Sequence, residues 1–484
     1  MVSLLQKTDQ YRPEIHFAPE KNWMNDPNGM VYFNGFYHLF FQHNPQDSVW
    51  GPMHWGHAIS KDMIHWEEQS IALFPDELGM IFSGSIVIDW NNTTGFFDDQ
   101  TGMVAIFTHH LDQSSGPPKQ YQSLAYSKDE GRTWVKFSGN PVLKHESKVD
   151  FRDPKVFWHD DTQRWVMVLA TGQTIMIYTS LNLIDWQFAS EFGEGRGYQD
   201  AVWECPDLFE LGMEGASLKK WVMLVSVGDN PHKQEGSKTQ YFIGDFDGEV
   251  FTPDDELVRW LDYGKDNYAG VSFSDILPAD GRRIYMGWMS NWRYANEVPT
   301  GEWRSQMTLP RKLSLVETNQ GVLLNQKPVE ELMNYAQDYI KLPSNQALVN
   351  LTLPIVKNPF MIDVIVAPAD AKEIIFTLQT CSGEELVVKI DNRKEVLVLD
   401  RSRSGVVEFS DLFSCEQVLP ISIEKRYHLQ MICDHSSIEI FINEGNYALT
   451  SLVYPRSAFD TLTVTTDSLK AKLVEGEIRQ LKND

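Results

Sequence analysis

The sequence predicts an all-β protein in which a five-bladed β-propeller is followed by a β-sandwich. Short turn motifs that end in Trp recur through the first part of the chain, and strand-like apolar runs lie between them. In the last third, apolar and polar residues alternate with a period of two. We therefore expect the propeller over residues 1–325, a linker with a short helix over 326–337 and the sandwich over 338–484.

The turn motifs form a weak internal repeat. SKDMIHW (60–66), SKDEGRTW (127–134) and TSLNLIDW (179–186) each combine Ser, a polar turn and Trp, and DFDGEVF (245–251) is a degenerate fourth copy. A spacing of about 50 to 70 residues, with about four strands per unit, is typical of propeller blades. The alternative is an irregular β-sandwich in which these turns arise by chance.

The second part of the chain has a different pattern. PVEELMNY (328–335) starts with Pro and acidic residues, as the first turn of a helix prefers. Segments such as EIIFTLQT (373–380), ELVVKIDN (385–392) and SIEIFINEG (437–445) then alternate apolar and polar residues, which predicts antiparallel strands stacked in a sandwich. No catalytic cluster is evident there, so we expect a structural or accessory role.

Composition limits the possible partners. The formal net charge of -25 disfavours nucleic acid and anionic membranes, because both require clustered Lys and Arg. Aromatic residues make up 12% of the chain and include 15 Trp, whose flat apolar faces pack β cores and also stack on sugar rings. A neutral carbohydrate is therefore the expected substrate. The oligomeric state cannot be inferred from the sequence.

The chain shows no secretory signal and no membrane span, because it lacks apolar segments of the necessary length. We expect a cytoplasmic protein, although a secreted form without its signal would have the same sequence. The four cysteines are widely spaced and predict neither a zinc site nor a disulfide framework. His54 and His57 in HWGH are expected to pack in the fold, and no metal or organic cofactor is predicted.

Three acids lie in unusual motifs: Asp26 in NWMNDPNGM, Asp153 in FRDPK and Glu204 in WECPDLF. Each lies near an apolar residue and within two residues of a Pro, although Asp26 alone also fits a surface turn. Trp203 and Cys205 flank Glu204, so we expect a poorly solvated carboxyl with a raised pKa, suited to a general acid. Amide and turn donors around Asp26 would favour its ionised form. Such a pair is what a retaining glycosidase uses.

The motifs WMNDPNG, GPMHWGH, FSGS, FRDPK, WECPDLF and GWMSNW, in this order, resemble the β-fructofuranosidases of glycoside hydrolase family 32. The run from LDYGKDNYAGVSFSD to SQMTLPRKL (261–313) resembles, within that family, the exo-acting levanases and inulinases. The resemblance implies a five-bladed propeller followed by a sandwich. It implies that Asp26 is the nucleophile, Glu204 the acid/base and Asp153 a transition-state stabiliser kept ionised by Arg152. It also implies that the terminal fructose is surrounded by Asn25, Gln42, Trp50, Phe82, Ser83 and Trp288, with Trp23, Trp55 and Tyr268 as apolar lining.

The expected function is that of a retaining exo-acting β-fructosidase acting on fructo-oligosaccharides, inulin, levan and sucrose. Trp50 and Trp55, near the first acid, are candidates for stacking on the sugar. A fructosyltransferase would use the same covalent intermediate and pass fructose to another sugar. A catalytically silent carbohydrate-binding propeller is the alternative from another class, and it is disfavoured because all three acids are present.

Overall fold

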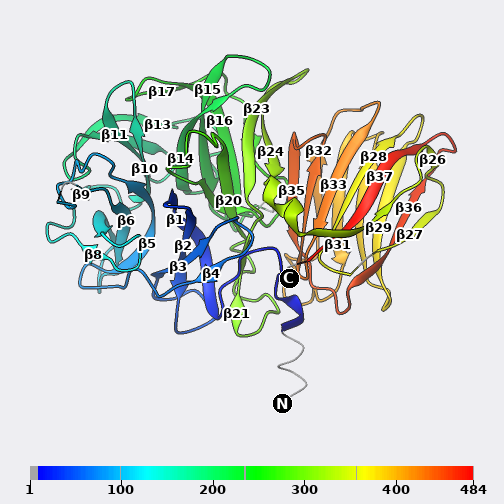
Figure 1. Ribbon diagram of the computed structural model, residues 1–484, viewed down its shortest axis with the longest axis horizontal. Coiled ribbons are helices and arrows are strands. Elements are labelled where there is room, and N and C mark those ends of the chain that lie inside the picture. The colour runs from blue at the N-terminus through cyan, green and yellow to red at the C-terminus, as the bar shows by residue number, and fades with distance from the viewer. Residues whose placement is uncertain (1–8, 99, 234–235, 356, 483–484) are drawn as a thin grey trace.

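The computed structural model describes residues 9–98, 100–233, 236–355 and 357–482, and it contains two lobes side by side (Figure 1). The N-terminal lobe is a ring of sheets and the C-terminal lobe a stack of two, so the predicted fold class is confirmed. Residues 1–8, on which part of the signal-sequence prediction falls, lie outside the described residues. Within the described ranges, no helix has the length and apolar character needed to cross a membrane.

Five sheets form the propeller, preceded by a short 3-10 helix, η1 (Asp9–Tyr11). Blade one contains β1 (Asn22–Phe33), β2 (Phe36–Asn44), β3 (His54–Ser60) and β4 (Glu67–Glu68), with β21 (Trp303–Arg304) parallel to β1. Blade two contains β5 (Met80–Ile88), β6 (Met103–Leu111), β7 (Lys119–Ser127), β8 (Val135–Lys136) and β9 (Leu143–Lys144). Blade three contains β10 (Arg152–His159), β11 (Arg164–Ala170), β12 (Ile175–Ser180) and β13 (Trp186–Phe192).

The last two blades complete the ring. Blade four contains β14 (Trp203–Gly212), β15 (Lys219–Val227), β16 (Lys238–Phe246), β17 (Phe251–Pro253) and β18 (Arg259–Trp260). Blade five contains β19 (Tyr268–Ser272), β20 (Arg283–Met289), β22 (Gln306–Met307), β23 (Arg311–Thr318) and β24 (Gly321–Pro328). The first strands of the blades, β1, β5, β10, β14 and β19, contact one another in a closed ring. They are therefore the innermost strands and surround the propeller axis.

The repeated motifs are the turns that lead into an outer strand in each of the first four blades. In the first copy, Ser60 Oγ accepts hydrogen bonds from the backbone N–H groups of Asp62 and Met63, and Trp66 Nε1 donates to the Met63 carbonyl at 2.8 Å. The corresponding Trp donates to the residue three positions before it in the second and third copies. In the fourth copy, Asp247 accepts from two backbone N–H groups instead. The first three copies thus share one set of local turn hydrogen bonds, and the fourth forms its turn through a different acceptor.

The sandwich consists of two antiparallel sheets. One contains β25 (Ala336–Lys341), β26 (Gln346–Ala347), β28 (Phe360–Ala367), β33 (Tyr427–Cys433), β34 (Ser437–Ile442), β35 (Tyr447–Leu452) and β37 (Lys472–Leu481). The other contains β27 (Leu351–Pro354), β29 (Glu373–Thr380), β30 (Glu385–Asp391), β31 (Val396–Arg403), β32 (Glu416–Pro420) and β36 (Phe459–Thr466). Every second residue of β29 is buried, as the alternation predicts, and these residues join one apolar core between the sheets.

A short segment connects the two lobes. The last propeller strand, β24, ends at Pro328, three residues later than the predicted boundary, and β25 of the sandwich begins at Ala336. The intervening helix is a 3-10 helix, η2 (Glu330–Tyr335), with two acidic residues in its first turn. Its Leu332 is buried in a core cluster shared with both lobes, so the linker is packed against the fold.

Buried ion pairs fix the lobes to each other. Arg311 of blade five donates to Glu439 of the sandwich at 3.1 Å and to Asp262 at 3.0 Å, and all three side chains are buried. His16, from the N-terminal segment, lies between Asp434 at 2.8 Å and Glu439 at 2.9 Å. Removing one partner would leave an uncompensated buried charge, so this cluster holds the propeller in one orientation against the sandwich.

Candidate active site

All three motif acids lie at the same level of the propeller, where the innermost strands are irregular. The register of β1 shifts between Met24 and Pro27, that of β10 between Arg152 and Lys155, and that of β14 between Glu204 and Asp207. Strands β5 and β19 have a similar shift, so all five innermost strands carry a bulge. A bulge re-aims a side chain, and the nearby Pro has no N–H that the ladder would need. The bulges thus point the acids to the axis.

A pocket of about 240 Å³ lies at these bulges. Nine of the predicted site residues line it, together with Trp292, which the sequence analysis did not select: the nine are Asn25, Asp26, Gln42, Trp50, Phe82, Ser83, Arg152, Asp153 and Glu204. Seven of the nine come from four motifs that lie up to about 180 positions apart in the chain, and Gln42 and Trp50 lie between the first two motifs, as expected where blades converge on one axis. The pocket therefore combines three acids, polar amides and an aromatic rim.

Asp26 lies at the base of this pocket between hydrogen-bond donors. Ser83 Oγ donates to Asp26 Oδ2 at 2.7 Å, and Asn25 Nδ2 donates to Oδ1 at 3.0 Å. These donors favour the carboxylate, as predicted. Burial and the nearby charge of Glu204 nevertheless outweigh them and raise the pKa of Asp26 to about 6. The prediction that its surroundings favour ionisation overall was therefore wrong, because sequence neighbours do not reveal the second acid.

Asp153 is more deeply buried. The Cys205 N–H donates to Asp153 Oδ2 at 3.0 Å, and Arg152 Nε lies 3.9 Å from the same oxygen. Burial raises the pKa of Asp153, the Arg152 charge opposes this effect, and the charges of Glu204 and Asp26 add to it, so that the net shift is upward to about 7. The prediction that Arg152 keeps Asp153 ionised was thus wrong, because burial and the charges of the two neighbouring acids outweigh the Arg152 charge.

Glu204 has polar surroundings. Arg152 donates to Glu204 Oε1 from Nη2 at 3.1 Å and from Nε at 3.3 Å, and the Tyr268 hydroxyl donates to Oε2. About a quarter of the Glu204 side chain, 24%, is exposed. The predicted apolar and poorly solvated position was wrong: Trp203 is buried inside the blade, away from the carboxyl, and packs against Phe192 and Phe242.

Four predicted site aromatics, Trp23, Trp55, Tyr268 and Trp288, lie behind the pocket wall. Their exposed fractions are 0 to 1%, so the prediction that they line the pocket or surround the fructose is corrected. Two of them donate hydrogen bonds to residues that line the pocket. Trp23 Nε1 donates to Asn25 Oδ1 at 2.7 Å, and Trp55 Nε1 donates to the Phe82 carbonyl at 3.0 Å.

Trp292 is the functional candidate that the sequence analysis missed. It belongs to GWMSNW, one of the motifs on which the family resemblance rests, but only Trp288 of that motif was predicted to contact the fructose. Trp288 lies within β20 and is fully buried, whereas Trp292 follows the strand and is half-buried at the pocket. Its ring stacks on Trp23 with centroids 6.1 Å apart. The signal that could have found it is its position just after the end of a strand, where loops carry binding residues.

His54 and His57 of the HWGH motif are predicted to pack in the fold and not to bind a metal. His57 is buried, stacks on Phe40 with centroids 4.1 Å apart and shares a hydrogen bond of 3.1 Å with His38. Burial also lowers the pKa of His57 well below its usual value. Over the described part of the chain, no group of three or more His, Cys, Asp or Glu side chains is arranged to hold a metal ion. The four cysteines are free thiols.

Comparison with known proteins identifies the relatives of this arrangement. The family model for the N-terminal domain of glycosyl hydrolases family 32 matches residues 16–328, and the model for the C-terminal part matches residues 327–480. A levanase of Bacillus subtilis is 47% identical over 92% of this chain, which spans 67% of that protein. The extracellular exo-inulinase InuE of Aspergillus niger is 37% identical, covering 96% of this chain and 91% of the relative.

Solved structures of similar proteins share the fold over nearly the whole chain. Exo-inulinase from Aspergillus awamori superposes with a TM-score of 0.89 at 35% identity, covering 98% of both chains. The β-fructofuranosidase of Schwanniomyces occidentalis, complexed with fructosyl-erythritol, has a TM-score of 0.88 at 33% identity and covers 98% of this chain and 99% of that one.

Proposed function

The chain belongs to family 32 of the glycosyl hydrolases, and we propose how its pocket cleaves a substrate. It is an exo-acting β-fructosidase, which releases terminal non-reducing fructose from fructans and sucrose. In our proposal Asp26 is the nucleophile, Glu204 the general acid and base, and Asp153 the stabilising acid. Short fructo-oligosaccharides and sucrose are the proposed natural substrates.

The observation that carries the proposal is the convergence of three acids at the base of a small pocket. Its volume of about 240 Å³ is below the ~300–1,000 Å³ typical of sites for drug-sized ligands, so it suits a single sugar ring. Trp50 at the rim is 41% exposed and packs edge-to-face against Phe82. A chain end that enters the pocket would therefore place its terminal ring on the acids and its next unit among the rim aromatics.

The first chemical step forms a covalent fructosyl-enzyme. The Asp26 carboxylate attacks C2 of the terminal fructose, and the bond from C2 to the leaving oxygen breaks as Glu204 gives its proton to that oxygen. With a pKa of about 6, Asp26 is mostly ionised at neutral pH and can act as the nucleophile. Ser83 and Asn25 hold its two oxygens, which fixes the direction of attack.

The second step releases fructose. Glu204, now a carboxylate, removes a proton from water while the water oxygen attacks C2 and the bond to Asp26 breaks, which gives net retention. Arg152 and Tyr268 donate to separate oxygens of Glu204 and so hold it in place for both proton transfers. We propose that Asp153 accepts hydrogen bonds from fructose hydroxyls, contacts that strengthen as positive charge develops on the ring.

A product profile tests this function. Purified protein is given sucrose, short inulin oligosaccharides and levan separately, and the products are separated by chromatography. We expect fructose as the only new monosaccharide from the fructans at early times, together with chains one unit shorter, and no release by Asp26→Ala, which should remain folded. Internal fragments of inulin would contradict exo action, and longer oligosaccharides from sucrose would indicate that transfer to sugar exceeds hydrolysis.

A further inference from the structure

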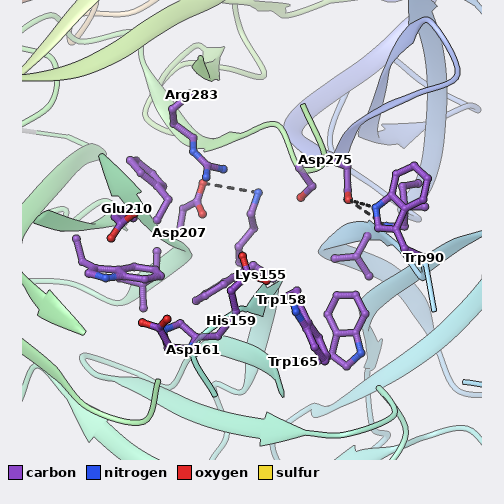
Figure 2. A pocket seen from close by; sticks show the side chains of 18 of the residues that line it. Trp90, Lys155, Trp158, His159, Asp161, Trp165, Asp207, Glu210, Asp275 and Arg283 are labelled. Atoms are coloured by element: carbon purple, nitrogen blue, oxygen red, sulfur yellow. Dashed lines mark hydrogen bonds and ion pairs between the residues drawn. The ribbon is translucent and has the colours of Figure 1, made fainter. Parts of the chain in front are cut away.

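A second and larger cavity lies at the other end of the propeller axis. Its volume is about 610 Å³, and residues of β5, β10, β14 and β20 line it (Figure 2). We call it the distal cavity. Three innermost strands run from the catalytic pocket to it: β5 from Ser83 to Val87, β10 from Asp153 to Phe157, and β14 from Glu204 to Phe209. The two sites therefore share walls but open at opposite ends of the ring.

Strand geometry separates the two sites clearly. Asp153 and Phe157 are four positions apart on β10, and at about 3.3 Å per residue this corresponds to roughly 13 Å. Between the two sites, Lys155 donates to the Ser272 carbonyl and lies 3.6 Å from Asp207 Oδ2. This buried pair fills the axis, so a sugar in the catalytic pocket cannot extend directly into the distal cavity.

The distal cavity offers aromatic faces to a ligand. Trp90 is 53% exposed, yet its Nε1 donates to Asp275 Oδ1 at 2.8 Å, which holds the indole ring in place. Trp158 packs edge-to-face on Trp165, with centroids 5.1 Å apart, and is itself only half-buried. Figure 2 shows Trp90 and Glu210 on opposite sides of the view, with Lys155 and Asp207 between them. Rigid, partly exposed Trp rings next to carboxylates are suited to the apolar faces and hydroxyls of a sugar.

One acceptor at the inner end of the cavity has no partner. Ser272 donates to Asp207 Oδ2 from its N–H at 2.6 Å and from its hydroxyl at 2.7 Å. Asp207 Oδ1 is buried and accepts no hydrogen bond from the described residues. The Asp207 side chain is fully buried, so it closes the inner end of the cavity, and the acids within reach of ligand hydroxyls are exposed ones such as Asp160 and Asp161.

The charge of the lining favours a neutral ligand. Five acids line the cavity, Asp160, Asp161, Asp207, Glu210 and Asp275, against the three cations Lys155, Lys219 and Arg283. Lys155 is paired with Asp207, and Lys219 with Glu210 at 2.5 Å. Arg283 has no carboxylate partner within 4 Å among the described residues, but it donates to the Phe273 carbonyl at 3.3 Å and packs over the Phe209 ring. The acids therefore outnumber the cations, which disfavours an anionic ligand, whereas carboxylates readily accept hydrogen bonds from hydroxyl groups.

We propose that the distal cavity is a second, non-catalytic carbohydrate site, which binds a fructan chain through stacking on Trp90 and Trp158 and hydroxyl donation to the surrounding acids. The choice of fructan among neutral saccharides rests on the proposed function of the catalytic pocket. A site of this kind would keep a long chain on the enzyme while its free end is cut elsewhere. It would raise the local substrate concentration without affecting small substrates.

Affinity electrophoresis in gels that contain inulin tests this proposal. All proteins carry Asp26→Ala so that the polysaccharide is not degraded. Trp90→Ala and Trp158→Ala are compared with Phe188→Ala, which removes an aromatic ring of similar exposure, 57%, on β13 outside the lining. We expect the apparent Kd for inulin to rise about fivefold or more in either cavity variant, the size expected for one lost stacking contact, and to stay unchanged in the control.

Activity assays separate this proposal from the function itself. In the background with Asp26 intact, Trp90→Ala and Trp158→Ala should hydrolyse sucrose at the wild-type rate and show a higher KM for long inulin alone. Unchanged inulin retardation in both variants, alongside normal sucrose hydrolysis, would overturn the second site and leave the function standing. If the wild-type protein released no fructose, the proposed function would fail. The gel assay would still measure binding at the distal cavity, since it does not depend on activity. Gels that contain an α-glucan in place of inulin show whether the site prefers fructan.

Discussion

The backbone N–H of Cys205 donates a hydrogen bond of 3.0 Å to Asp153 Oδ2, so the residue that follows the proposed acid/base is tied to the stabilising acid. The Cys205 thiol lies 3.6 Å from both Asp153 Oδ2 and Asp26 Oδ2. Cys205 has a φ of 46°, in the left-handed region, at the bulge of β14. One strained residue thus sets the spacing of three acids from three blades.

The acid limb of the pH profile should follow Asp26. Since its pKa is raised to about 6 and only the carboxylate can attack, kcat/KM for sucrose should fall about tenfold for each pH unit below that value. Ser83→Ala removes a donor that lowers this pKa, so the limb should move to higher pH. Ser190→Ala, on β13 outside the pocket, is the control. A limb that stays in place in Ser83→Ala would exclude Asp26 as the group that titrates.

The loss of activity in Glu204→Ala should depend on the leaving group of the substrate. We expect a loss of about 10³-fold on sucrose, whose leaving oxygen must be protonated, within the 10²–10⁴ range for general acids. With β-D-fructofuranosyl fluoride the first step needs no acid, so a burst of fluoride should precede slow turnover, and added azide should restore steady turnover. Equal losses on the two substrates, without a burst, would remove Glu204 from the acid role.

Trp292→Ala should weaken substrate binding. The ring lines the pocket and packs against Trp288 with centroids 4.8 Å apart, so its loss removes a contact surface without touching the acids. We expect kcat/KM for sucrose to fall roughly tenfold, equivalent to about 1.4 kcal/mol, and Trp292→Phe to recover most of it. An unchanged kcat/KM in the Ala variant, with Phe188→Ala as the matched control, would place Trp292 outside the binding surface.

His16 should make the protein sensitive to alkali. Burial lowers its pKa, but the hydrogen bonds and charges of Asp434 and Glu439 outweigh this and raise the pKa to about 9. A raised histidine pKa contributes stability that is complete below pH 6.5 and is lost as the pH rises to about 9. We expect the free energy of unfolding to fall by about 3 kcal/mol over that window, following 1.36 kcal/mol per pKa unit.

Urea unfolding at several pH values measures this effect. His16→Asn should be less stable than the wild type at pH 6.5 and should lose most of the dependence between pH 6.5 and 9. His65→Asn is the control, because 44% of the His65 side chain is exposed and the residue lies on blade one, outside the cluster. If the wild type and His16→Asn show parallel pH profiles, the ion cluster between the lobes is not the source of alkaline instability.

The sequence predicts the fold and the acids well because both depend on local chemistry. Ser, a polar residue and Trp form the same turn in three successive blades through hydrogen bonds to nearby backbone groups. Because these contacts are local, the repeat can be recognised from the sequence alone. The Pro within two residues of each acid marks a break in the strand ladder, and that break aims the acid at the axis.

The surroundings of each acid could not be predicted from its neighbours in the chain. Trp203 next to Glu204 suggested an apolar site, but the two side chains point to opposite sides, and Arg152 and Tyr268 from other blades complete the polar surroundings. The pKa of Asp26 likewise depends on Glu204, which is 178 positions away. The choice of Trp288 over Trp292 failed because alternation along β20 gives no information beyond its end at Met289.

Methanol trapping on the wild-type protein, with short inulin oligosaccharides as substrate, shows directly whether cleavage passes through a covalent intermediate on Asp26. Methanol competes with water for the fructosyl group on Asp26, and the methyl fructofuranoside formed does not change its anomeric form afterwards. The two-step mechanism predicts methyl β-D-fructofuranoside as the only methyl glycoside, alongside free fructose. The α anomer would show a single displacement with inversion and would contradict the role of Asp26 as a nucleophile.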